Sequence, residues 1–173
     1  MLPHIDDPQV TDLMTRAPEL RKHLTVTGYT TDPTGSELLM VFHRKLGRWL
    51  PPGGHVEVDE FPSDAVLREV WEETGVRAAH RATKALDLGL RGVLDVQLPS
   101  PLTMSAQLIP PGPRDTEHIH IDMMFELVAD PGEAVTYETR EVSGARWFTR
   151  AEILREDLTF DAVTAYARDR MID

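Results

Sequence analysis

One segment of this 173-residue chain constrains its fold and chemistry more than any other. Residues 51–60 are PPGGHVEVDE, and residues 68–76 are REVWEETGV. The prolines and glycines predict a loop, and the apolar spacing that follows predicts a helix over 62–74 that Gly75 ends. At about 100° per residue, this helix places its apolar side chains in one broad arc: Val66, Leu67, Val70 and Trp71.

Three carboxylates gather on the other side of the same helix, those of Glu69, Glu72 and Glu73. They share an arc of roughly 100°, so they repel one another. A run of glutamates is usually a solvated helix face, which is the plainest interpretation. A hard divalent cation offers another, because it removes the repulsion, prefers oxygen ligands and is often completed by substrate phosphates. Gly53 and Gly54 would let the backbone pass close to such an ion, where a carbonyl can serve as a ligand.

The spacing of nine residues favours a cation site over a solvated helix face. They are, in order, Gly54, Glu60, Arg68, Glu69, Val70, Glu72, Glu73, Gly75 and Val76. This order matches the Nudix box at every fixed position, so the chain resembles the Nudix hydrolases. The resemblance implies an α/β fold, namely an α/β/α sandwich with a mixed sheet in which the box forms loop, helix and loop. It also implies that water cleaves a nucleoside diphosphate linked to another group, with Mg²⁺ or Mn²⁺.

The resemblance assigns a role to each box residue. The implied metal ligands are the carboxylates of Glu69, Glu72 and Glu73 and the carbonyl of Gly53. Arg68 would orient the glutamates, and Glu60 is well placed to pair with Arg68 and hold the loop against the helix. The ion would neutralise the diphosphate, polarise phosphorus and lower the pKa of the attacking water.

The general base is left open, because its position varies within the family. Glu69 and Glu73 in the box are candidates to accept the water's proton. Glu141, six residues before Trp147, fits the downstream loop that supplies the base in other members, and Glu138 fits the same loop. The alternative for these two loop residues is a solvated acid without a catalytic role.

Histidines alternate in the segment EHIHID, where His118, His120 and Asp122 share one face of a predicted strand. This motif fits a metal site, since imidazole suits Zn²⁺ or Ni²⁺ better than Mg²⁺. We favour two other interpretations over this one: a polar strand face beside solvent or under the proline-rich loop, and contact with the phosphate or base of a substrate. Gly54 and His55 are further candidates for substrate contact if the geometry of the family holds.

Outside the box, the pattern predicts one domain overall, with an N-terminal helical cap over 1–23 and a Nudix domain over 24–173. The predicted elements are a cap helix within 6–22, a hairpin over 23–45 with its turn at 32–36, a loop over 46–60, strands over 81–90 and 92–98, a proline-rich loop over 99–116, a strand over 117–129, a short strand over 145–148, and helices over 149–156 and 161–171. Thr149 and Glu152 have the spacing of a capping box.

Composition limits the partners. The formal net charge of −11 disfavours binding to duplex nucleic acid, and it predicts that an anionic substrate arrives with a metal ion. There is no cysteine, which excludes a disulfide scaffold, a cysteine nucleophile and a thiolate metal site. No apolar run reaches the length of a membrane span, and no signal pattern opens the chain. We therefore expect a cytoplasmic protein that binds a small nucleotide-like molecule and no membrane. A homodimer is possible, with residues 1–22 as a plausible contact surface.

Two other functions compete with hydrolysis. Isopentenyl diphosphate isomerase shares the fold, but its chemistry in the family uses a cysteine that this chain lacks. A non-catalytic module that binds a nucleotide is the stronger alternative, although the intact set of acids favours catalysis. The sequence leaves the substrate open.

Overall fold

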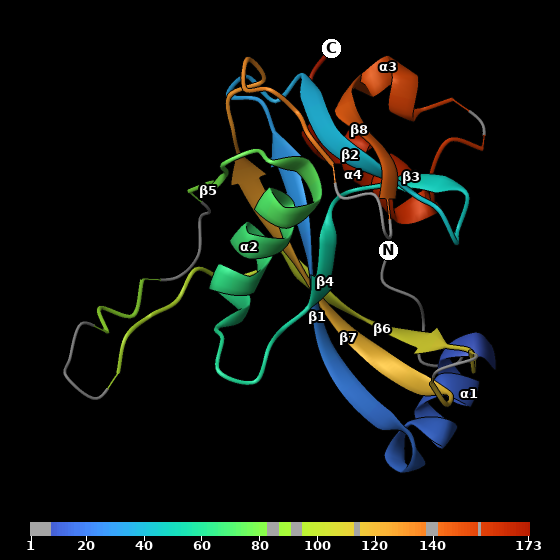
Figure 1. Ribbon diagram of the computed structural model, residues 1–173. Helices are drawn as coiled ribbons and strands as arrows, with labels where there is room; N and C mark the ends of the chain where they lie inside the picture. Colours follow the sequence, from blue (N-terminus) through green and yellow to red (C-terminus); the bar gives the residue numbers. More distant parts are fainter. Residues whose placement is uncertain (1–7, 83–86, 91–94, 113–114, 138–141, 156) are drawn as a thin grey trace.

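The computed structural model describes residues 8–82, 87–90, 95–112, 115–137, 142–155 and 157–173 (Figure 1). The helices in these ranges are α1 (Pro8–Arg16), the short 3-10 turn η1 (Ala17–Glu19), α2 (Pro62–Thr74), α3 (Arg150–Ile153) and α4 (Asp161–Arg170). The strands are β1 (Arg21–Thr31), β2 (Glu37–His43), β3 (Arg48–Leu50), β4 (Gly53–His55), β5 (Ala79–His80), β6 (Thr103–Ile109), β7 (His118–Val128) and β8 (Val142–Thr149).

The strands form one mixed sheet in the order β3-β2-β1-β7-β5, to which β4 adds on β1, β6 on β7 and β8 on β2. Strands β1 and β7 run parallel over eleven register pairs, from Arg21 opposite His118 to Thr31 opposite Val128. The other pairings are antiparallel. The long parallel pair forms the centre of the sheet and joins two parts of the chain that are far apart in sequence.

Helix α2 covers one face of the sheet (Figure 1). The contact is close because Gly28 on β1 has no side chain: a Cβ there would lie 2.8 Å from Cγ2 of Val70 and 3.2 Å from Cγ2 of Val66. The buried residues of this layer are Val26, Leu39, Ala65, Val66, Val70, Val76, Met123, Phe125, Leu127 and Ala129. Burial of this apolar surface holds the box helix on the sheet.

Helices α3 and α4 cover the opposite face (Figure 1). Tyr29 of β1 meets Tyr166 of α4 with ring centroids 4.4 Å apart, and Phe148 packs against Trp49 at 4.7 Å. The buried residues of this second layer are Tyr29, Leu38, Met40, Phe148, Ile153, Val163, Tyr166, Ala167 and Met171. A mixed sheet between two helical layers confirms the predicted α/β/α sandwich.

Several local predictions are confirmed. Strands β1 and β2 form the expected hairpin, and the Asp32 carboxylate closes its turn by accepting hydrogen bonds from the amides of Thr34, Ser36 and Glu37. Thr149 and Glu152 make the predicted capping box at the start of α3. Strand β7 and helix α4 lie within a residue of their predicted bounds.

Other local predictions are wrong. The loop predicted over 46–60 contains β3 and β4, and the loop predicted over 99–116 contains β6. Prolines flank all three strands, and in each case pairing with a longer strand supplies the hydrogen bonds that local propensity does not predict. Between 81 and 98, the described residues show no strand beyond a bridge at Val96, and residues 83–86 and 91–94 lie outside the described ranges.

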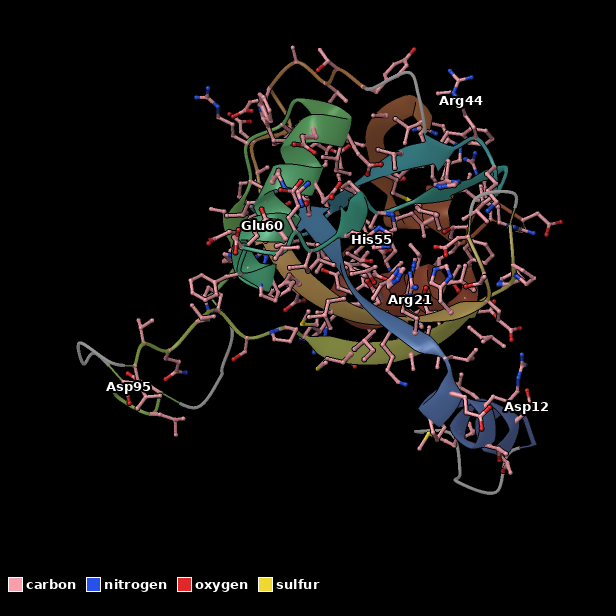
Figure 2. The ribbon with its side chains drawn as sticks, turned by 60° about the horizontal axis from the view of Figure 1, so that its bottom comes forward. Asp12, Arg21, Arg44, His55, Glu60 and Asp95 are labelled. Carbon is pink, nitrogen blue, oxygen red and sulfur yellow. The ribbon has the colours of Figure 1, made fainter. Side chains whose placement is uncertain are left out.

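The N-terminal segment packs at the end of the sheet near β6 and β7 (Figure 1), and Figure 2 shows Asp12 on its helix α1. Arg16 at the end of α1 forms ion pairs with Asp12 and with Glu117, which immediately precedes β7. Strand β1 already begins at Arg21, and the domain boundary predicted after residue 23 stays a prediction. No helix in the described ranges has the length and apolar character needed to cross a membrane.

Candidate active site

Helix α2 carries the acidic residues of the box, and its ends follow from sequence. Pro62 occupies the first turn, where its missing amide is not needed, and Gly75 ends the helix with φ +70°, a conformation that favours glycine. Its buried stripe is Ser63, Ala65, Val66, Val70 and Thr74. Trp71 does not belong to this stripe, contrary to the prediction: it is 55% exposed. The contact with the sheet is narrower than the apolar arc, so Trp71 lies at its edge.

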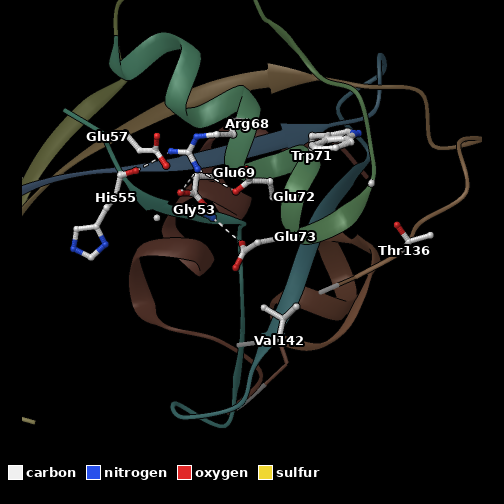
Figure 3. A pocket seen from close by; sticks show the side chains of 12 residues that line it. Gly53, His55, Glu57, Arg68, Glu69, Trp71, Glu72, Glu73, Thr136 and Val142 are labelled. Atoms are coloured by element: carbon white, nitrogen blue, oxygen red, sulfur yellow. Dashed lines mark hydrogen bonds and ion pairs between the residues drawn. The ribbon is translucent and has the colours of Figure 1, made fainter. Parts of the chain in front are cut away.

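Arg68 is the centre of the polar network on α2 (Figure 3). Its Nε and Nη2 atoms donate to the two carboxylate oxygens of Glu60, at 3.0 and 2.9 Å. Its Nη1 donates to Glu69 at 2.7 Å and to Glu72 at 3.1 Å, and Nη2 also reaches the carbonyl of His55 at 3.0 Å. The predicted Glu60–Arg68 pair is confirmed. One guanidinium thus ties the loop to two of the three box glutamates.

Two glycines of β4 contact the carboxylates of Glu69 and Glu73. The amide of Gly53 donates to Oε2 of Glu73 at 3.0 Å. At Gly54, a Cβ would lie only 2.6 Å from the carboxyl carbon of Glu69, so the glutamate occupies the space that a side chain would need. The three carboxylates therefore have two donors. Glu69 and Glu72 accept hydrogen bonds from Arg68, and Glu73 accepts one from the amide of Gly53.

The electrostatics of this network have two parts. Hydrogen bonding to Glu60 is the main cause that raises the pKa of Arg68 above its ordinary value, and the same contact lowers the pKa of the Glu60 carboxyl. Burial raises the pKa of Glu69, and the neighbouring Arg68 only partly opposes this effect. Burial thus makes the ionised form of Glu69 less favourable than it would be in water. A cation bound to this carboxylate would stabilise the ionised form.

A cavity of about 1020 Å³ opens beside these residues (Figure 3). Gly53, Gly54, Arg68 and the three glutamates line it, and Trp71, Thr136 and Val142 extend its wall. The carboxylates in its lining are oxygen donors, which fit a hard divalent ion such as Mg²⁺ or Mn²⁺. Glu138 and Glu141, the predicted loop candidates for the general base, lie outside the described residues.

The predicted histidines come together at a different place. His55 follows Gly54 on β4, and its ring points away from Glu69 and Glu73 (Figure 3). His118 and His120 of β7 lie beside it, with the His55 and His120 ring centroids 4.9 Å apart. A fourth imidazole, His23 of β1, completes the group, at 4.6 Å from His118 and 5.4 Å from His55. The contact of these histidines with a substrate stays a prediction.

Sequence reasoning missed His23 because the residue carries no motif of its own. It reaches the group only through the parallel register that places it opposite His120. Burial, with the charges of His55, His118 and His23, lowers the pKa of His120 to about 4. Asp122, the third member of the predicted motif, is instead buried, and it accepts hydrogen bonds from the hydroxyls of Thr25 and Thr27.

Comparison with known proteins identifies the family of this chain. The model of the NUDIX domain matches residues 21–168, which is most of the chain. This chain belongs to the Nudix family. A solved structure of a NUDIX family hydrolase from Clostridium perfringens superposes with a TM-score of 0.69 at 23% identity, covering 86% of this chain and 95% of that one. At this identity the likeness shows the fold, including the mixed sheet.

Curated relatives match this Nudix chain over shorter stretches. A MutT-like protein of Streptomyces ambofaciens is 44% identical over 54 residues, which are 31% of this chain and 34% of that protein. The m7GpppN-mRNA hydrolase NUDT17 of Bos taurus is 50% identical over 42 residues, which are 24% of this chain and 14% of that protein. The matched part thus spans about a third or less of either relative.

Proposed function

We propose that this Nudix chain is a metal-dependent hydrolase that cleaves the diphosphate linkage of a nucleotide or of a nucleoside diphosphate derivative with water. One observation carries the proposal: Arg68 and the glycines of β4 hold three glutamates at the wall of a cavity large enough for a nucleotide. A solvated helix face needs neither a cavity nor the glycine that makes room for Glu69.

The metal ligands in this proposal are the carboxylates of Glu69, Glu72 and Glu73 and the carbonyl of Gly53. When bound there, Mg²⁺ or Mn²⁺ neutralises the diphosphate and makes the attacking water more acidic. Arg68 keeps Glu69 and Glu72 oriented before the substrate arrives, because its planar guanidinium contacts both of them and Glu60 at once. Gly54 makes room for the Glu69 carboxylate, and its contact with the substrate is part of this proposal.

A carboxylate must also accept the proton of the attacking water. Glu69 is one candidate, because its part-buried carboxylate lies at the wall of the cavity beside Arg68. Glu73 and Glu141 remain candidates for the same role. Assigning the base requires the pH dependence of kcat for the variants Glu69→Gln, Glu73→Gln and Glu141→Gln. The true base is the one whose loss removes the acidic limb of the profile.

The substrate is proposed only as a class. A screen with Mg²⁺ and Mn²⁺ should cover nucleoside triphosphates with oxidised bases included, nucleotide sugars, ADP-ribose, dinucleoside polyphosphates and NADH. The name of the NUDT17 relative adds a capped dinucleotide of the m7GpppN type. Released phosphate, pyrophosphate or nucleoside monophosphate identifies the bond that is cleaved.

The variant Glu73→Gln tests the catalytic assignment. Glutamine keeps the shape of the side chain and an oxygen that can accept from the Gly53 amide, but it loses the charge that a divalent ion needs. We expect kcat to fall about a hundredfold or more with an unchanged melting temperature. Glu19→Gln, an exposed acid outside the box, is the matched control and should retain full activity.

Two results would count against this proposal. Activity of Glu73→Gln within a few fold of the wild type would show that the ligand assignment is wrong. No hydrolysis of any substrate, together with tight metal-dependent nucleotide binding in calorimetry, would instead show a nucleotide-binding module without catalysis.

A further inference from the structure

The four imidazoles of His23, His55, His118 and His120 form a compact group that the proposed hydrolysis does not use. They come from three strands: β1, β4 and β7. Successive side chains of a strand point to opposite faces, so His55 points away from the face that Gly54 presents to Glu69. His23 lies on the same face of β1 as Tyr29, which packs against α4. The histidines and the glutamates therefore occupy opposite faces of the sheet.

The strand register explains why the histidines meet. In the parallel pair β1–β7, His23 is directly opposite His120, and His118 lies two residues before His120 on the same face. In the antiparallel pair β1–β4, His55 is opposite Thr25. Thr25 is two residues after His23 and lies on the same face of β1, so His55 and His23 are neighbours on that face. The pairing of β1, β4 and β7 thus brings together histidines that are distant in sequence.

The ligating nitrogens are nearly in place for a metal ion. One nitrogen each from His23, His55 and His120 lie within 4.8 Å of one another. The Nε2 atoms of His118 and His120 are 3.1 Å apart. Around a tetrahedral Zn²⁺ with Zn–N bonds of about 2.0–2.1 Å, neighbouring nitrogens are about 3.3 Å apart. Small rotations of the side chains would bring the wider pairs to that separation.

The hydrogen bond of His118 suits a metal ligand. Its Nδ1 lies 2.7 Å from the carbonyl oxygen of Thr116. A carbonyl only accepts, so Nδ1 carries a hydrogen, and in the neutral ring Nε2, which faces His120, then has the free lone pair. A backbone carbonyl that fixes the ring through the other nitrogen is the usual support of a metal-binding histidine.

We propose that His23, His55 and His120, with His118 as the fourth ligand, bind a divalent transition-metal ion at a site separate from the glutamates. The ligand chemistry favours Zn²⁺, Ni²⁺ or Cu²⁺ over Mg²⁺, because imidazole nitrogen is a poor ligand for hard ions. His118 is buried and His55 is exposed, so the ion enters from the solvent side of β4. A bound ion would clamp β4 to β1 and β7, next to the glycines of the box.

Metal binding tests this site without relying on hydrolysis. The double variant Glu69→Gln/Glu73→Gln disables the glutamate site, and we expect it still to bind one Zn²⁺ per chain in calorimetry. In imidazole NMR spectra of this variant, Zn²⁺ should shift the signals of the four clustered histidines. The signals of His43 and His80, which lie elsewhere, should stay in place.

Further substitutions in the same background identify the ligands. We expect His23→Gln/His120→Gln to weaken Zn²⁺ binding at least about tenfold. His55→Gln, at an exposed position that tolerates substitution, should weaken it to a similar degree even if the double variant fails to fold. His43→Gln is the matched control and should bind Zn²⁺ like its parent, since the His43 ring accepts a hydrogen bond from the amide of Leu46 at a turn, away from the cluster.

Other outcomes would overturn the site. Unshifted imidazole signals, or Zn²⁺ binding that is lost with the glutamates and kept by the histidine variants, would place the ion elsewhere. Zn²⁺ binding could instead be unchanged by His55→Gln and His120→Gln, while the same substitutions in the wild-type chain raise the KM for Mg²⁺-supported hydrolysis. That result would make the histidines substrate contacts and exclude a metal site.

Discussion

Gly54 is the residue at which the backbone and the acids of the box come closest. No side chain fits there, because its Cβ would lie 2.6 Å from the Glu69 carboxyl group. The requirement is one of space: the φ angle of Gly54 is not in the left-handed region. The glycine therefore determines where the Glu69 carboxylate rests, and through it the contact with Arg68.

The variant Gly54→Ala tests this requirement. Its methyl group displaces Glu69, so we expect a loss of at least about tenfold in Mg²⁺ affinity and in kcat. Gly112→Ala is the matched control, because a Cβ at Gly112 has no neighbour within 4 Å and φ there is not positive. Equal activity of the two variants, measured over a Mg²⁺ titration, would contradict the assigned position of Glu69.

At the level of residues, the sequence predicts the acids well and the histidines poorly. Glu69, Glu72 and Glu73 share one helix, so their relative positions follow from helical geometry alone. His23 meets His120 only through a strand pairing across 97 positions, which no local pattern reveals. The sequence places Trp71 in the apolar arc of the helix, but the structure leaves it exposed. Hydrophobicity alone does not indicate which part of such an arc contacts the sheet.

At the level of elements, the close packing of α2 on β1 depends on Gly28. We expect Gly28→Ala to lower the free energy of unfolding by about 1–3 kcal/mol, since its methyl group would press against Val70 and Val66. Denaturant unfolding measures this loss. In the double variant Gly28→Ala/Val70→Ala, the loss should be smaller than the sum of the two single losses, because the smaller side chain makes room. Strict additivity would show that the two positions do not touch.

The capping box of α3 makes a prediction about pH. The Thr149 amide donates to the Glu152 carboxylate, and this contact, with Arg146, lowers the pKa of Glu152 below its ordinary 4.5. A lowered pKa in the folded state stabilises the fold above pH 4.5, and the contribution disappears as the pH falls through the folded value. Thermal unfolding should therefore show Glu152→Gln less stable than wild type at pH 7, with the difference shrinking below pH 4.5. A difference in stability that does not change with pH would contradict this contribution.

Elements with strong internal patterns were predictable, and those that depend on a neighbour were not. Strand β7 is apolar and long, and α2 has a helical period with clear ends, so both were predicted within a residue or two. Strand β4 consists of two glycines and a histidine, which have little strand propensity, and it exists because β1 offers free hydrogen-bonding groups. Strand β6 depends on β7 in the same way.

At the level of the whole molecule, association into a homodimer stays a prediction. The exposed side chain of Met14 on α1 supports the N-terminal segment as the contact. Light scattering should then give twice the chain mass of 19.5 kDa. Met14→Lys should shift the mass toward the monomer, whereas Leu46→Lys, at another exposed apolar position on the β2–β3 turn, should not. A monomer mass for the wild type at high protein concentration would rule the dimer out.

The parallel pairing of β1 with β7 has a consequence for synthesis. The box ends at Val76, but the strand that completes the surface beneath α2 ends only at Val128. At typical translation rates of about 5–20 residues per second, roughly three to ten seconds pass between these two points. During that interval the acidic helix has been made but has no complete sheet to rest on. The box segment of this protein is therefore synthesised several seconds before β7 completes the surface on which its helix packs.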